Sequence, residues 1–198
     1  SLYASPIIPI HNDLSIIRQI KTSDDVISTI RKKYPKLAKL LKIAISSIGL
    51  PDIKVVVSNS DGEIAIINGV QRQKQGNVIQ NKDGSWTITI FRSAKHPVKT
   101  LAHEVVHIFT LGAISKNDSA TKACRIFYQY CKDSFAKDEA KPYGFKSFKE
   151  FIAEFFINEE FREYLKSKSP MDQSVFDTAV KNIPQEHKNR IHSLYDSI

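Results

Sequence analysis

Two histidines four positions apart, His103 and His107, are the residues of this chain best suited to bind a metal ion together. On a helix, side chains at this spacing lie one above the other on the same face, so both imidazoles can reach one ion. Glu104 follows His103 directly, about 100° further round the helix, and would flank the metal without binding it. A carboxylate there can accept a proton from water that the metal activates. The order His-Glu-x-x-His therefore predicts a zinc hydrolase site.

The residues around this motif favour a helix. Pro97 suits a first helical turn. Apolar side chains that would form a face directed away from the imidazoles stand at Leu101, Val105, Ile108 and Phe109. The alternative is a surface helix that carries two histidines by chance, and a third metal ligand elsewhere in the chain would argue against it.

A catalytic zinc ion needs a third protein ligand and one open position for water. Thr110 and Ala113 stand where a glycine and a third histidine would complete an extended motif, so the third ligand must lie further along the chain. His187 and His192 follow only near the C-terminus, and we expect them to be surface or helix-end residues.

Glu150 and Glu154 are the remaining candidates, because they share one face of a helix predicted over 148–156. The other face can be buried through Phe148, Phe151, Ile152 and Phe155. One carboxylate can bind the metal while the other orients a ligating imidazole from outside the metal shell, and the spacing leaves open which does which. The alternative is that both are solvated charges of an amphipathic helix.

Two segments of the chain resemble a known family. The first is His103-Glu104-Val105-Val106-His107, and the second, about forty residues later, combines Tyr143-Gly144 with Glu150-Phe151-Ile152-Ala153-Glu154-Phe155-Phe156. Together they resemble the catalytic domain of anthrax lethal factor and its relatives, the lethal-factor-like zinc peptidases of the gluzincin group. The resemblance covers about residues 86–168 and implies a zinc-dependent endopeptidase with a zincin-like fold, Zn²⁺ as its cofactor, and a protein or peptide substrate.

The same resemblance implies a role for each site residue. In that family a Tyr stands seven positions before the ligating Glu, as Tyr143 stands before Glu150. His103, His107 and Glu150 are then the metal ligands, and Glu154 supports the site from outside the metal shell. Glu104 is the general base, and Tyr143 acts on the substrate oxyanion or leaving group.

Two positions depart from the family pattern. Val106 stands where the family often has Gly, which implies wider packing beneath the site, and Phe155 replaces a small residue. Neither change removes a catalytic group, so we expect an active enzyme. The resemblance also implies secretion or delivery into a host cell. Because the chain begins at Ser1 and not at Met, we expect a trimmed native start, and any signal segment would not be visible.

The whole sequence predicts an α+β fold with a small mixed or antiparallel sheet, an active-site helix and a mainly helical remainder. After an extended lead-in over 1–11, helices are predicted over 13–20, 24–33, 36–48, from 117, and over 148–156, 159–165, 172–181 and 184–196. Strands are predicted over 53–57, 63–67, 77–80 and 86–91, with a polar stretch over 69–76. We expect a helical N-terminal region over 1–50 and a catalytic domain over 51–198, or one compact domain overall.

The strand predicted over 86–91 directly precedes the active-site helix, after a hairpin signal at residues 81–84. In zincin peptidases an edge strand just upstream of that helix pairs with the extended substrate. We therefore interpret this strand as a candidate for substrate pairing, with an ordinary hairpin strand as the alternative.

The net charge of +8 suggests an acidic partner, which can be a nucleic acid, an acidic protein surface or an anionic membrane. Lys36, Lys39 and Lys42 form a basic stripe on one predicted helix, either a solvated face or a docking surface. The alternative function is thus a basic helical binding module with a degenerate or structural zinc motif. Nucleic acid is disfavoured, because no nucleic-acid motif is present.

The sequence argues against a membrane-spanning segment and against a disulfide between its two cysteines. No apolar stretch is long enough to cross a bilayer. Cys124 and Cys131, seven residues apart on one predicted helix, lie too far apart to form a disulfide, and we expect buried thiols.

Overall fold

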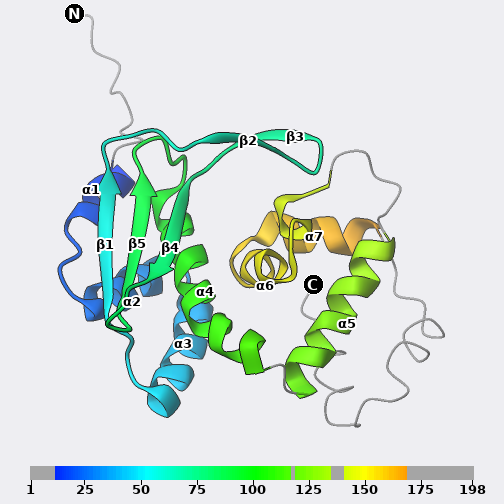
Figure 1. Cartoon of the computed structure of the whole chain (residues 1–198), viewed down its shortest axis with the longest axis horizontal. Coiled ribbons are helices and arrows are strands. Elements are labelled where there is room, and N and C mark those ends of the chain that lie inside the picture. Colours follow the sequence, from blue (N-terminus) through cyan, green and yellow to red (C-terminus); the bar gives the residue numbers. More distant parts are fainter. Residues whose placement is uncertain (1–11, 117–118, 135–140, 169–198) are drawn as a thin grey trace, which may run out of the picture. The chain divides into compact units, whose positions relative to one another are not determined.

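The computed structural model describes residues 12–116, 119–134 and 141–168. The lead-in predicted over 1–11 and the helices predicted over 172–181 and 184–196 lie outside these residues. The fold is α+β, with a small sheet among helices (Figure 1). The chain divides into two compact units, residues 1–65 with 72–108 and residues 66–71 with 109–198. The sequence-based boundary at residue 50 stays a prediction.

The first unit begins with three helices, as predicted: α1 (Asn12–Arg18), α2 (Ser23–Lys33) and α3 (Pro35–Ile48). A capping box starts α2, in which the Thr22 hydroxyl accepts the Asp25 N–H at 3.1 Å and the Asp25 carboxylate accepts the Thr22 N–H at 3.0 Å. Backbone hydrogen bonds from Lys21 and Thr22 lower the pKa of Asp25. Gly49, with φ of 85°, ends α3 in a conformation that favours glycine.

The sheet of the first unit has three strands: β1 (Ile53–Ser58), β4 (Gly76–Gln80) and β5 (Trp86–Phe91), in the order β1-β5-β4. β1 runs parallel to β5 and β4 runs antiparallel to it, so the sheet is mixed. Ile88 and Ile90 of β5 are fully buried, which places the alternating apolar side chains of this strand in the core.

The central position of β5 corrects one sequence-based interpretation. The strand over 86–91 is not an edge strand, because β1 and β4 occupy both of its hydrogen-bonding edges. The prediction that an extended substrate pairs with β5 is therefore wrong. The reason is non-local: β1 precedes β5 by about thirty residues and still becomes its parallel neighbour. Among the described strands of this sheet, β1 and β4 stand at the edges.

A second, two-stranded sheet is formed by β2 (Ile64–Ile67) and β3 (Val70–Gln73). The sequence predicted β2, whereas β3 lies in the stretch interpreted as polar. The two strands meet at Asn68 and Gly69, with φ values of 53° and 77°, the left-handed conformation that an Asn-Gly hairpin turn needs. Figure 1 shows these strands as a hairpin.

The helix that carries the His-Glu-x-x-His motif, α4 (Pro97–Lys116), begins in the first unit and continues into the second. The second unit also contains α5 (Ser119–Ser134), the short 3-10 helix η1 (Tyr143–Phe145), α6 (Phe148–Ile157) and α7 (Glu159–Lys168). Its core is an aromatic cluster built from Phe127, Cys131, Phe145, Phe151, Phe155, Phe161 and Leu165. Most of the ring pairs pack edge-to-face or tilted, and Phe151 and Phe155 are stacked, with centroids about 6 Å apart. This packing fixes η1 and α6 in the unit.

Candidate metal centre

The histidine pair lies on a fully enclosed part of α4. Every residue from 101 to 108 is buried, including His103 at 8%, Glu104 at 7% and His107 at 3% exposure. Leu101 and Val105 are completely buried, as predicted for the apolar side of the helix. This part of α4 is therefore not a surface helix, and polar side chains at such depth need partners of their own.

The two imidazoles point at one another. Their Nε2 atoms are 3.0 Å apart, and the ring centroids lie 4.6 Å apart with an interplanar angle of 85°. This separation lies within hydrogen-bond distance. It is also close to the spacing of about 3.3 Å expected for two nitrogens bound tetrahedrally to one zinc ion at about 2.0–2.1 Å. The i, i+4 spacing thus produces convergent nitrogen donors.

Glu150 lies in the first turn of α6, where the backbone stabilises its charge. Ser147 is the N-cap residue, and its hydroxyl accepts the Glu150 N–H at 3.3 Å. The positive end of the helix dipole favours a carboxylate at this position. Glu150 is only 6% exposed, and its neighbours on α6, Phe148 and Phe151, are buried as well. An ionised carboxylate at such depth requires a compensating positive charge.

The structure brings together the three residues that the resemblance implied as ligands. One donor atom each from His103, His107 and Glu150 can be chosen so that all three lie within 4.8 Å of one another. Two imidazole nitrogens and one carboxylate oxygen are a donor set that fits a divalent metal ion. These residues can therefore hold a metal ion.

Two further predicted site residues, Glu154 and Tyr143, lie in the second unit. Glu154 is half-buried on α6, and its Oε2 atom accepts a hydrogen bond of 2.9 Å from Asn158 Nδ2. Tyr143 is the first residue of η1 and half-buried, with the Lys146 ammonium 5.6 Å from its ring centroid. His187 and His192 lie outside the described residues.

The two departures from the family pattern have different surroundings. Val106 is 2% exposed, so its side chain is one of the buried residues of the core. Phe155 is 5% exposed and packs edge-to-face on Phe127, with centroids 5.9 Å apart. The larger residue at 155 thus contributes to the aromatic cluster that anchors α6.

Cys131 is a free, buried thiol, as the sequence predicted. Burial raises its pKa to about 12, so the thiol stays protonated at neutral pH. A protonated, buried thiol is neither a nucleophile nor a metal ligand, and a cysteine mechanism at Cys131 is excluded. The side chain of Cys124 lies outside the described part of the structure.

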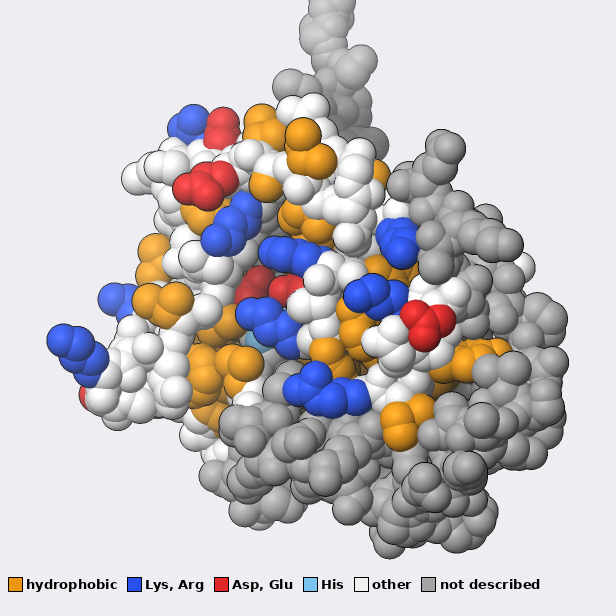
Figure 2. All heavy atoms as spheres, turned by 45° about the vertical axis from the view of Figure 1, so that its right-hand side comes forward, with side chains coloured by type: hydrophobic (Ala, Val, Ile, Leu, Met, Phe, Trp, Pro, Cys, Tyr) orange, Lys and Arg blue, Asp and Glu red, His pale blue; other side chains and the backbone are white. Residues whose placement is uncertain are grey.

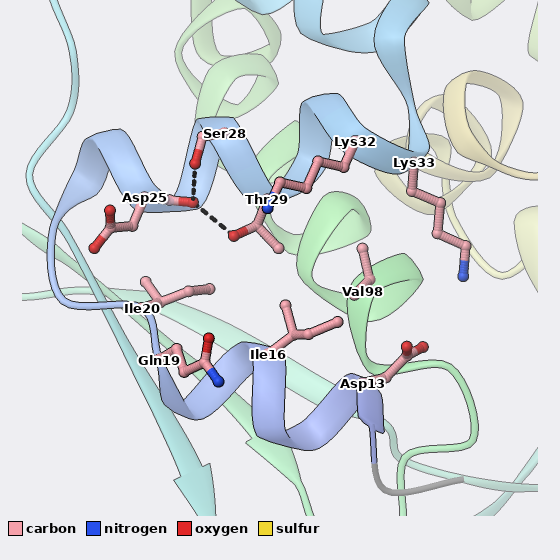
Figure 3. A pocket seen from close by; sticks show the side chains of 10 residues that line it. All are labelled: Asp13, Ile16, Gln19, Ile20, Asp25, Ser28, Thr29, Lys32, Lys33 and Val98. Carbon is pink, nitrogen blue, oxygen red and sulfur yellow. Dashed lines mark hydrogen bonds between the residues drawn. The ribbon is translucent and has the colours of Figure 1, made fainter. Parts of the chain in front are cut away.

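A pocket of about 380 Å³ lies elsewhere in the first unit, between α1, α2 and the start of α4 (Figure 3). Its polar groups serve the fold. Ser28 and Thr29 donate hydrogen bonds to the Asp25 carbonyl, and the Asp25 carboxylate belongs to the cap of α2. None of the predicted site residues lines this pocket.

Comparisons of the chain with protein-family models, with curated proteins and with solved structures gave no match. Within the described residues, no helix is both long and apolar enough to cross a membrane.

Proposed function

We propose that this protein is a zinc-dependent endopeptidase that hydrolyses peptide bonds in a protein or peptide substrate. The observation that carries the proposal is the convergence of donor atoms from His103, His107 and Glu150 within 4.8 Å. Glu104, on the helix of the two histidines, is buried as well. The lethal-factor-like gluzincins, whose motifs the sequence resembles, combine these residue types in a zincin-like fold. We assign the chain to that type of enzyme on this basis.

In the proposed site, His103, His107 and Glu150 hold the zinc ion. Bound zinc lowers the pKa of water towards about 7 and polarises a carbonyl group. Glu104, one position after His103, accepts the proton of the attacking water and returns it to the leaving amine. Its burial excludes bulk solvent, which strengthens its electrostatic interaction with the reacting groups.

Two residues of the second unit complete the proposed machinery. The Tyr143 hydroxyl donates a hydrogen bond where negative charge develops on the substrate oxygen. Glu154 lies one helical turn after Glu150 and orients a ligating imidazole. The Asn158 amide, 2.9 Å from Glu154 Oε2, holds that carboxylate in a defined rotamer.

An acidic region of the substrate is a further part of the proposal. Residues 26–51 contain six basic side chains and no acidic one, and the basic side chains are exposed: Arg31, Lys32, Lys33, Lys36, Lys39 and Lys42. On the face shown in Figure 2, Lys and Arg are also more frequent than Asp and Glu among the described residues. Such a field attracts an anionic partner and accelerates encounter at low salt. Secretion or delivery into a host cell is proposed from the family resemblance alone.

The test is cleavage of a library of unstructured peptides, read by mass spectrometry. We expect cleavage by the purified protein, its loss after treatment with 1,10-phenanthroline, and its return when Zn²⁺ is added. A binding module without catalysis would leave the library intact and would bind an anionic probe such as heparin with strong salt dependence. That result would overturn the peptidase assignment.

A further inference from the structure

The turn that carries Tyr143 is contacted by the hairpin tip, 74 residues earlier in the chain. Asn68 Nδ2 donates a hydrogen bond of 3.4 Å to the carbonyl oxygen of Pro142. Pro142 is the N-cap residue of η1, and Tyr143 follows it directly. Both partners belong to the second unit.

The backbone of the hairpin tip is adapted to present this amide. Asn68 has φ of 53°, a left-handed conformation that Asn tolerates better than most residues. Gly69 continues the turn with φ of 77°. Ile64 and Ile66 of β2 are 62% and 78% exposed and contribute no burial to the hairpin, and Ile67 is half-buried. The hydrogen bond from Asn68 to Pro142 is a polar contact that links the tip to the rest of the second unit.

The other contacts of η1 fix the residues after Tyr143. The Phe145 N–H donates to the Pro142 carbonyl at 3.0 Å, and the Lys146 N–H donates to the Tyr143 carbonyl at 2.9 Å. Phe145 is buried in the aromatic cluster. A Cβ atom at Gly144 would lie 2.5 Å from the Phe161 ring, so the turn packs directly on that ring. Asn68 secures the N-terminal side of the turn, where the Pro142 carbonyl receives both hydrogen bonds.

We propose that Asn68 is a positioning residue for Tyr143: its side-chain amide holds the Pro142 carbonyl and thereby the peptide from which the Tyr143 side chain extends. The inference rests on the proposed function, in which the Tyr143 hydroxyl acts on the substrate. A hydrogen-bond donor must be held within a few tenths of an ångström of its productive place, and displacement by about 1 Å can cost two orders of magnitude in rate.

The test uses Asn68→Gly and Asn68→Asp in the full chain. Both remove the amide donor, and both retain a residue that tolerates the left-handed backbone. With a peptide cleaved in the library assay, we expect kcat to fall roughly tenfold while KM and zinc content stay unchanged. Asn81→Asp is the matched control, because Asn81 is an amide in the other hairpin turn, where it donates to Ser85 and Thr87.

A double-mutant cycle separates positioning from a general structural role. In the Tyr143→Phe background, Asn68→Gly should lower kcat no further, because the hydroxyl that it positions is gone. If the two losses multiply, Asn68 does not act through Tyr143 and the inference is overturned.

Amide hydrogen exchange by NMR tests the contact without any catalytic assay. Asn68→Gly should accelerate exchange at Phe145 and Lys146 roughly five- to tenfold, and leave Phe151 in α6 unchanged. Unchanged exchange at Phe145 and Lys146 would refute the role of Asn68. A wild type that cleaves no peptide would refute the proposed function, and the exchange data would still decide whether Asn68 fixes the turn.

Discussion

Glu104→Gln is expected to abolish nearly all peptidase activity, with kcat lowered by a factor of about 10² to 10⁴, the range that general acid–base catalysis contributes. Glutamine keeps the shape of the side chain but cannot accept the proton of the attacking water. Zinc content should equal that of the wild type, because in the proposed site Glu104 flanks the metal and is not one of its ligands. Initial rates on a cleaved peptide, with zinc measured in the same samples, check both expectations.

The control for this substitution is Glu159→Gln, which makes the same chemical change at an exposed position of α7. It should leave rate and metal content unchanged. Normal turnover in Glu104→Gln would remove Glu104 from the mechanism, and loss of zinc in that variant would show that it serves the metal shell instead.

Tyr143→Phe has the second-largest expected effect. Removal of one hydroxyl that stabilises developing negative charge typically costs about 3 kcal/mol of barrier, so kcat should fall by a factor of about 10² to 10³. KM and zinc content should change little, since the ring and its packing in η1 remain. Steady-state kinetics on one peptide separate the two parameters.

Tyr128→Phe provides the comparison for Tyr143→Phe. Tyr128 is a half-buried tyrosine of the same unit, and its ring packs against Phe148 and Phe151 with centroids 5.8 Å and 5.1 Å away. Loss of its hydroxyl should not alter kcat. An equal loss in both variants, or an unchanged rate in Tyr143→Phe, would contradict a catalytic hydroxyl at Tyr143.

Local sequence patterns predicted the helices that carry the candidate site. The start of α4 at Pro97 and the start of α6 after Ser147 follow from helix-capping rules. The i, i+4 spacing of His103 and His107 was sufficient to predict that their side chains converge. Such features depend on residues a few positions apart, and the sequence contains that information directly.

The choice between Glu150 and Glu154 shows where local information ends. Both lie on one face of α6, and spacing left their roles open. The structure places a Glu150 ligand atom with those of the histidines, and it places Glu154 Oε2 2.9 Å from Asn158 Nδ2. The burial of Phe151 and Phe155 in the aromatic cluster helps to set the rotation of this helix, and that burial depends on tertiary packing.

Strand pairing was the part of the fold that the sequence did not predict. β5 looked like an edge strand because its only local partner is β4, across the hairpin signal. Its parallel pairing with β1 joins residues about thirty positions apart, which no local pattern encodes. β3 was missed because its residues, Val70–Gln73, are mostly polar and none of them is fully buried.

The role inferred for Asn68 could not have been found from the sequence either. An Asn-Gly pair beside a strand-like run is a hairpin signal, but the sequence analysis did not use it at Asn68 and Gly69 and interpreted the stretch over 69–76 as polar. The contact on which the proposed positioning role rests joins Asn68 to Pro142, 74 residues away. Local turn chemistry thus explains the backbone, and tertiary structure alone supplies the partner.

The central claim, that His103, His107 and Glu150 bind zinc, is tested most directly by elemental analysis of the purified protein beside Glu150→Ala and Glu154→Ala. We expect about one zinc per chain in the wild type, as a three-ligand catalytic site binds, near-complete loss in Glu150→Ala and a smaller loss in Glu154→Ala. Absence of zinc from the wild type even after reconstitution, or a Glu150→Ala variant that retains the wild-type amount, would contradict the proposed ligand set.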